Sequence, residues 1–216
     1  MPGEFKEEYL EAIFDLTEKG DSAKTSDIAK RMKVADASVT EMLGKLSEEG
    51  FVEYKPYHGT TLTKKGLKVA TKIKRKHRLL ERFLYDFLGL KKSKVHEEAC
   101  RMEHALSDEA ADALDEMLDY PVKCPDDGKP IPPEAPLKDG EDMLVNVKAG
   151  SMVQVVRFEG GRGLRANVTT MGIREGKKLK VVTREPAGGP LVVKTGNTTV
   201  TLGRGMASRI IVAQMK

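Results

Sequence analysis

The block KVHEEACRMEH at positions 94–104 constrains this chain more than any other part of its sequence. Helical side chains advance by about 100° per residue, so a helix over 94–106 would place three further ligand-type side chains within about 80° of His96, namely Cys100, Glu103 and His104. A separate apolar stripe would pack the helix against a core, and it consists of Val95, Ala99, Met102 and Leu106. The block therefore predicts an amphipathic helix with a chemically unusual face.

A second segment repeats this residue pattern, because His77 and Glu81 are also one helical turn apart. Charged residues at such spacing usually form only a solvated helix face, and a lone His is more often structural than functional. Here, however, three of the four His and one of the two Cys fall in the two segments. Imidazole, carboxylate and thiolate together are a ligand set for a divalent transition metal. We interpret the two segments as metal-binding.

The N-terminal third has the pattern of a winged helix-turn-helix. A helix over 5–18 is followed by two short helices over 24–32 and 37–49, with Thr25 or Ser26 as the expected cap of the first short one. Gly50 is expected to end the second, and residues 51–63 alternate like a hairpin wing. Such a unit places its second helix in the major groove. The predicted DNA-contacting residues are Thr25, Ser26, Ser38, Thr40, Glu41, Lys45, Lys55 and His58. The alternative is ordinary polar surface or a protein-interaction module.

The remainder predicts a helical middle and a β-rich end. Helices over 66–88, 94–106 and 107–118 have leucine- and phenylalanine-rich faces that indicate a homodimer. Residues 120–140 are rich in Pro and Gly and predict a linker, in which we interpret Cys124 as a non-ligand. Five valine-rich segments then predict a small β-barrel, over 151–158, 178–183, 191–194, 198–202 and 210–213.

The expected fold class is α+β and multidomain. We predict a winged helix-turn-helix DNA-binding domain over 1–73, an all-helical metal-binding and dimerisation domain with its linker over 74–140, and a small β-barrel over 141–216.

Composition excludes several classes of protein. No apolar run is long enough for a membrane span, and the first residues do not resemble a signal peptide, so a cytoplasmic location is expected. Two Cys do not make a disulfide framework. Residues 140–216 hold 13 basic and 5 acidic side chains, which leaves open a metal-independent DNA-architectural protein. A metal hydrolase is the other alternative, but the chain has no His-Glu-x-x-His motif, and we expect no enzyme.

Taken together, the winged helix, the block RKHRLLER at 75–82 and the block at 94–104 resemble the metal-dependent repressors of the DtxR/MntR type, the family of the diphtheria toxin repressor. The segment CPDDGKPIP at 124–132 is similar to the family's Pro-rich segment, and MGIREGKKL at 171–179 resembles the FeoA/SH3-like domain of many members. The resemblance covers essentially the whole chain.

The resemblance implies two metal sites. The primary site would use Cys100, Glu103 and His104 with Glu8, where iron-type members place Met and manganese-type members Asp. The ancillary site would use His77, Glu81 and His96, and Glu11 matches a further manganese-type ligand. Iron-type members add two ligands from the barrel at positions that align with Gly161 and Leu164, and Glu159 is a possible substitute. Glu41 replaces a Gln of the iron-type recognition helix.

The sequence therefore predicts a homodimeric transcriptional repressor, activated by a divalent metal, that binds a palindromic DNA operator and controls genes of metal homeostasis. The thiolate of Cys100 favours Fe²⁺ over the harder Mn²⁺, whereas Glu8 adds a hard ligand, so iron is the first choice and a manganese-responsive regulator the alternative. Other divalent transition metals are expected to bind in vitro.

Overall fold

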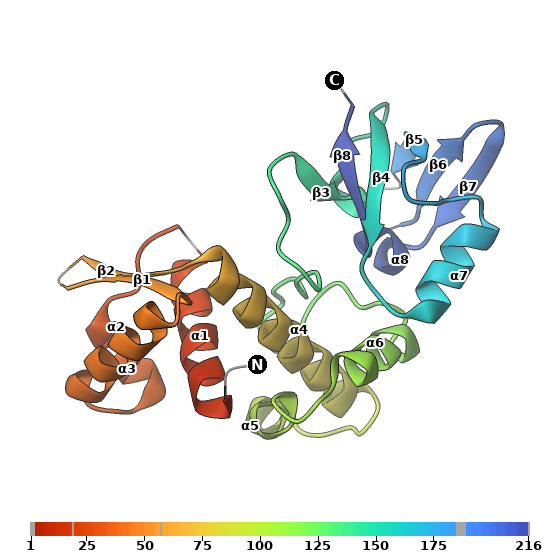
Figure 1. Ribbon diagram of the computed structural model, residues 1–216. Helices are drawn as coiled ribbons and strands as arrows, with labels where there is room; N and C mark the ends of the chain where they lie inside the picture. The colour runs from red at the N-terminus through yellow and green to blue at the C-terminus, as the bar shows by residue number, and fades with distance from the viewer. Residues whose placement is uncertain (1–2, 19, 57, 185–188, 216) are drawn as a thin grey trace. The chain divides into compact units, whose positions relative to one another are not determined.

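The computed structural model describes residues 3–18, 20–56, 58–184 and 189–215, which form the helices and strands of Figure 1. The chain divides into two compact units, Met1–Arg75 and Lys76–Lys216, and the division falls within helix α4. Among the described residues, no helix is both long enough and apolar enough to cross a membrane.

The first unit is a winged helix-turn-helix, as predicted. Its elements are α1 (Glu4–Thr17), α2 (Thr25–Met32), α3 (Asp36–Glu48), β1 (Val52–Lys55), β2 (Gly59–Leu62) and the first half of α4 (Lys64–Asp86). The two strands form an antiparallel hairpin in which Val52 faces Leu62. Apolar side chains from all three N-terminal helices fill one core, among them Tyr9, Ile13, Ile28, Leu43 and Leu46.

Two of the predicted helix ends can be compared with the structure. Gly50 follows the C-cap of α3 with a φ of 75°, which confirms the predicted helix end, because glycine adopts this left-handed conformation without steric cost. The prediction that Thr25 or Ser26 caps α2 is wrong. Lys24 is the N-cap residue, and its side chain makes no capping hydrogen bond.

The helices of the second unit are the remainder of α4, α5 (Lys92–Glu103) and α6 (Asp108–Met117). They pack around two small apolar clusters. The Ser107 hydroxyl accepts a hydrogen bond from the Ala110 amide at 3.0 Å and so caps the start of α6. The apolar stripe of α5 is only partly as predicted: Val95 and Ala99 are buried, whereas Met102 is 39% exposed. The helix also ends at Glu103, so His104 is its C-cap rather than a residue of its interior.

The C-terminal part is one antiparallel sheet of six strands in the order β3-β8-β4-β5-β6-β7. Five strands lie at the predicted segments: β4 (Met152–Phe158), β5 (Lys178–Arg184), β6 (Leu191–Thr195), β7 (Thr198–Leu202) and β8 (Ile210–Gln214). The sequence reading missed four short elements, which are β3 (Glu141–Met143), a 3-10 turn (Leu144–Asn146), α7 (Arg162–Thr170) and α8 (Arg204–Ser208). Leu164 of α7 packs into the core of this part rather than toward a ligand site.

A buried ion pair joins the sheet to α6. The Arg209 guanidinium donates two hydrogen bonds of 2.6 Å to the carboxylate of Asp115, and also donates to the carbonyl of Pro121 at 2.9 Å. The side chains of Arg209 and Asp115 are 1% and 0% exposed. A bidentate pair of this kind fixes orientation as well as distance. It therefore holds the sheet against the helical part of the same unit.

Candidate metal centre and DNA interface

His77 is the centre of a cluster of ligand-type side chains in the second unit. Its Nδ1 lies 2.6 Å from Glu103 Oε2, and its Nε2 lies 2.9 Å from Glu81 Oε1. All three side chains are almost completely buried. They come together because α4 and α5 pack along the apolar cluster of Leu80, Leu84, Val95 and Ala99, which places one polar face of each helix against the other.

The cluster has two sides, and the imidazoles of His77 and His96 each direct one ring nitrogen to each side. On one side, Cys100 Sγ lies 3.9 Å from His77 Nδ1 and 3.8 Å from His96 Nε2. On the other side, Glu81 Oε1 lies within 3.1 Å of His77 Nε2 and of His96 Nδ1. The ring centroids are 4.8 Å apart in an edge-on arrangement. The two rings are thus shared between a thiol side and a carboxylate side.

The spacing of these atoms fits a metal ion. Ligand nitrogen and sulfur atoms bind a divalent ion at about 2.0–2.3 Å, so two ligands of one ion lie no more than about 4.6 Å apart. The Cys100 sulfur meets this limit with both imidazoles. The ligand atoms of His77, His96 and Cys100 all lie within 4.8 Å of one another. No large rearrangement is needed for these three side chains to bind one ion.

Glu103 links this cluster to His104. Its Oε2 faces His77, while its Oε1 lies 3.3 Å from His104 Nε2. The three predicted primary ligands of this unit, Cys100, Glu103 and His104, and the three predicted ancillary ligands, His77, Glu81 and His96, therefore form one connected network.

The electrostatics of the network favour a cation within it. Burial alone would lower the pKa of His77, but hydrogen bonds to Cys100, Glu103 and Glu81 outweigh burial and raise this pKa to about 12. Hydrogen bonds to Cys100 and Glu81 raise the pKa of His96 to about 10. Burial opposes ionisation of Glu81, yet hydrogen bonds from the two imidazoles hold its pKa well below the usual range. Without metal, protonated imidazoles supply the positive charge that the carboxylates require.

The two cysteines have opposite character. The pKa of Cys100 is lowered, because hydrogen bonds from His77 and His96 outweigh its burial. Cys124 is buried and donates a hydrogen bond of 2.6 Å to Glu81 Oε2, and burial and this bond together raise its pKa to about 12. From the sequence, Cys124 was interpreted as a non-ligand within the linker. The fold nevertheless brings its thiol to the carboxylate side of the cluster. No local sequence pattern predicts the contact between Cys124 and Glu81.

The other candidate ligands come from other parts of the chain. Glu8 is half-buried on α1 in the first unit. Glu11 is on the same helix, and its carboxylate accepts a hydrogen bond of 3.0 Å from Lys74. Glu159 is buried, where its Oε1 accepts from Arg157 at 2.5 Å and its Oε2 accepts from the Ala135 amide at 3.2 Å. Gly161, the N-cap of α7, has no side chain to offer.

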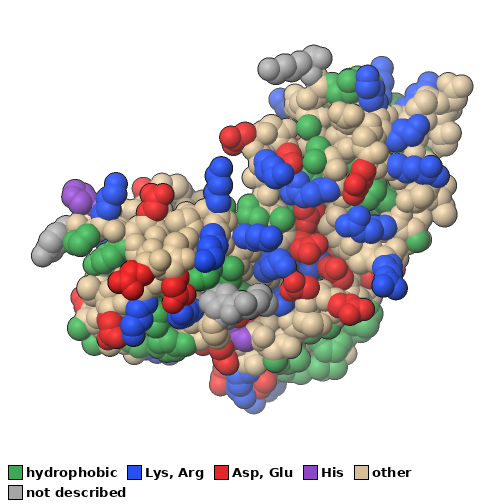
Figure 2. All heavy atoms as spheres, viewed as in Figure 1, with side chains coloured by type: hydrophobic (Ala, Val, Ile, Leu, Met, Phe, Trp, Pro, Cys, Tyr) green, Lys and Arg blue, Asp and Glu red, His purple; other side chains and the backbone are tan. Residues whose placement is uncertain are grey.

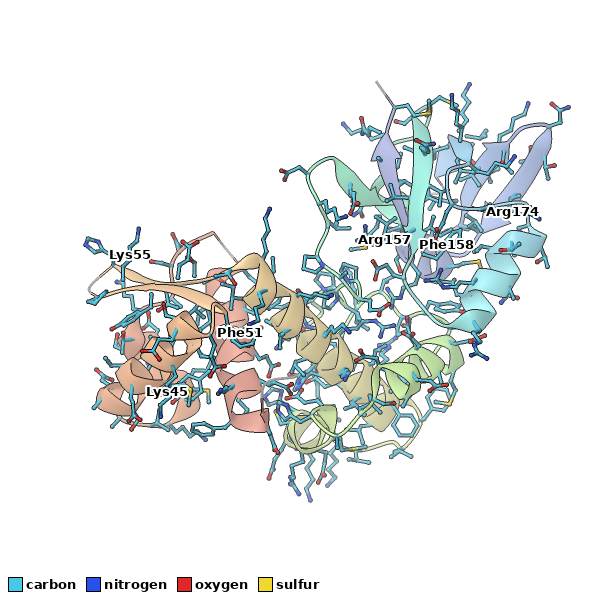
Figure 3. All side chains as sticks on the ribbon, in the orientation of Figure 1. Lys45, Phe51, Lys55, Arg157, Phe158 and Arg174 are labelled. Carbon is cyan, nitrogen blue, oxygen red and sulfur yellow. The ribbon has the colours of Figure 1, made fainter. Side chains whose placement is uncertain are left out.

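All the predicted DNA-contacting residues lie on the surface of the first unit, where Thr25 is half-buried and the others are exposed. Ser38, Thr40, Glu41 and Lys45 come from α3, and Lys55 and His58 come from the hairpin. Figure 3 shows Lys45 on α3 and Lys55 at the end of β1. Glu41 and Lys45 form an exposed ion pair at 2.7 Å, and a hollow of about 430 Å³ beside the hairpin is lined in part by Lys55 and His58.

Comparison with known proteins accounts for this architecture. Residues 2–60 match the iron dependent repressor N-terminal DNA binding domain, residues 63–133 match the iron dependent repressor metal binding and dimerisation domain, and residues 143–214 match the FeoA domain. The iron-dependent repressor IdeR of Mycobacterium tuberculosis is 32% identical over an alignment of 224 residues, which covers 97% of this chain and 96% of the relative. The chain belongs to the DtxR/IdeR family of iron-dependent repressors.

The proteins that this chain resembles are named for more than one metal. The diphtheria toxin repressor of Corynebacterium glutamicum is 39% identical over 126 residues, which cover 58% of this chain and 55% of that protein. The solved structure of the manganese regulator SloR is 30% identical, has a TM-score of 0.56 and covers 97% of this chain and 98% of its own. The chain is thus a metal-dependent transcriptional repressor and not an enzyme. Its matched domains imply DNA and a second copy of the chain as partners.

Proposed function

We propose that this repressor is activated by Fe²⁺ and binds a palindromic operator as a homodimer to control genes of metal homeostasis. The observation that carries the proposal is the arrangement around His77 and His96, with the Cys100 thiol on one side and the Glu81 carboxylate on the other. A thiol of lowered pKa suits Fe²⁺ and softer ions better than Mn²⁺. The manganese-responsive alternative rests on the carboxylates Glu8 and Glu11, which are hard ligands.

We propose the following roles for the site residues. Cys100, Glu103 and His104 bind the activating ion together with Glu8, and His77, Glu81 and His96 bind a second ion. The bound ion supplies the positive charge that protonated imidazoles provide in its absence. Because Glu8 belongs to the DNA-binding unit, its participation would tie that unit to the metal-binding segment and fix the separation of two recognition helices in a dimer. Metal and operator would then bind with reciprocal positive coupling.

The same proposal assigns the remaining parts of the chain. Residues 1–73 form a domain that binds DNA. Residues 74–140 form a domain that binds metal and dimerises, and residues 141–216 form the FeoA-type domain. The operator contacts are the residues of α2, α3 and the hairpin that the sequence predicted to contact DNA. The dimer contact uses apolar side chains that the folded chain leaves exposed, which are Phe87, Leu88 and Met117.

An operator-binding titration tests the metal dependence. A duplex is first selected from a random-sequence library by the full chain with Fe²⁺ under anaerobic conditions. Its affinity is then measured with Fe²⁺, Mn²⁺, Zn²⁺ and Co²⁺, for the wild type and for Glu8→Met. We expect tight binding only with metal, Fe²⁺ to activate at a lower concentration than Mn²⁺, and Glu8→Met to widen that difference. Equal binding in excess chelator would contradict the proposal, and activation by Mn²⁺ alone would favour the manganese alternative.

A second set of variants tests the site. Cys100→Ala and His104→Ala should abolish activation by metal. Glu97→Ala is the matched control, because Glu97 is an exposed residue of the same helix and pairs only with Arg101 at 2.8 Å among the hydrogen bonds described for it. An unchanged metal response in either site variant would refute the assignment.

A further inference from the structure

A basic hollow in the first unit is lined by none of the predicted operator-contacting residues. It has a volume of about 670 Å³, and we call it the lysine hollow. Its walls come from the start of α1, the end of α3 and the first half of α4, and its lining residues are Gly3, Lys6, Glu49, Phe51, Lys65, Lys68, Val69 and Lys72. Side chains of Lys and Arg, drawn blue, stand over the start of α4 in Figure 2.

Three of the four lysines lie along one stripe of α4. Lys65, Lys68 and Lys72 are spaced by three and four residues, which places them within an arc of about 60° on the helix. Like charges at this spacing repel one another on a helix surface. A bound polyanion would convert that repulsion into attraction.

The fourth lysine neutralises the single carboxylate among the described lining residues. Lys6 Nζ lies 2.5 Å from Glu49 Oε1. Lys65 is held in place from two directions, since its Nζ donates to the Glu49 carbonyl at 2.8 Å and lies 4.1 Å from the centre of the Phe51 ring. The lysine hollow therefore has a net positive charge, and one of its cations is already ordered.

The lysine hollow continues directly from the recognition helix. Glu41, Lys45 and Glu49 follow one another at intervals of four residues, so they lie on one face of α3 and its C-cap. Lys45 is a predicted operator contact, and Glu49 forms the edge of the lysine hollow one helical turn, or about 5.4 Å, farther along. Figure 3 shows Lys45 on α3 and Phe51 just beyond the end of this helix.

We infer that the lysine hollow binds the phosphate backbone of duplex DNA that flanks the base pairs read by α3. The inference rests on the proposed operator binding and adds a second, sequence-independent contact to it. Duplex DNA is the occupant that fits, because a regular line of phosphates can extend from the face of α3 to lysines one turn away. Lys68 and Lys72 would make this contact, and neither is among the operator contacts named above.

The test is the salt dependence of DNA binding by the full chain. The double variant Lys68→Gln/Lys72→Gln is compared with Lys148→Gln/Lys194→Gln, which removes the same charge from two exposed positions of the other unit. Affinity for the selected duplex is measured between 50 and 200 mM salt, with saturating metal and with chelator, using long and short flanks. Each phosphate contact contributes about 0.9 to the slope of log affinity against log salt. We expect the magnitude of the slope to fall by about 1.8 to 3.6 in the first variant only, because each of the two protomers of the proposed dimer loses one or two phosphate contacts.

The discrimination between the selected duplex and a scrambled one should stay unchanged, and the gain in affinity from longer flanks should shrink. An unaltered slope in Lys68→Gln/Lys72→Gln would overturn the inference and leave an acidic protein surface as the occupant. A loss of discrimination would also overturn it. DNA binding that does not depend on metal, with an altered slope in this variant, would instead contradict the proposed metal switch and support the contact between the lysine hollow and DNA.

Discussion

The buried pair of Arg209 and Asp115 gives the most direct test of how the C-terminal sheet is held. In Asp115→Asn the side chain keeps its shape but loses its charge, so the guanidinium of Arg209, 1% exposed, remains buried without its counter-ion. Removing one partner of a buried pair costs about 3–5 kcal/mol. A kilocalorie shifts the melting temperature of a domain of this size by about 2–4 °C, so we expect a fall of roughly 6 to 20 °C.

Calorimetry and circular dichroism would measure this shift. The matched control is Glu97→Gln, which breaks an exposed pair at 2.8 Å and should cost only about 0.3–0.5 kcal/mol. The double variant Asp115→Leu/Arg209→Met should recover most of the loss, because apolar side chains of similar volume often replace a buried pair without penalty. If Asp115→Asn melts within a degree or two of the control, the reasoning about this pair is refuted.

Two further outcomes follow from the contacts. Cys100→Ser should weaken Zn²⁺ binding by at least about tenfold and Mn²⁺ binding by less, because a hydroxyl replaces a soft thiolate. A competition titration against a chelating dye measures both affinities. Equal losses of affinity for the two ions would contradict the assignment of Cys100 as a ligand. Gly66→Ala should destabilise the first unit by about 1–3 kcal/mol despite the better helix propensity of alanine, because the new Cβ would lie 1.9 Å from the Phe51 carbonyl oxygen. Gly44→Ala is its control: apart from its chain neighbours and the backbone of its own helix, no atom of the described residues lies within 4 Å of the new Cβ, so urea unfolding should show a gain of about 1 kcal/mol.

Much of the fold was predictable because it follows local periodicity. The winged helix, the long helix α4 and five strands of the sheet each have an apolar repeat that fixes the type of element. The short elements were missed because they have little periodicity. Helix α7 begins after Gly161 and buries only Leu164 and Val168, and β3 has three residues of mixed polarity.

The site was predictable only in part. The face of α5 and the His77–Glu81 pair follow from residue spacing within one helix, and the structure brings them together. The contact of Cys124 with Glu81 joins residues 43 apart and depends on how the linker packs, which no local pattern encodes. The N-cap of α2 was misassigned by one position or more, because Thr25 and Ser26 are equally good cap residues by type but already lie inside the helix.

Glu103 has one oxygen directed to His77 and the other to His104. A rigid carboxylate cannot rotate toward one imidazole without withdrawing from the other, so under the proposed assignment of two metal sites we expect the two sets of ligands not to be loaded independently. Occupancy of one proposed site would then change the affinity of the other by the free energy of moving this single side chain. A metal-response curve of this repressor should therefore reflect two linked binding events, and replacing Glu103 would uncouple them as well as weaken them.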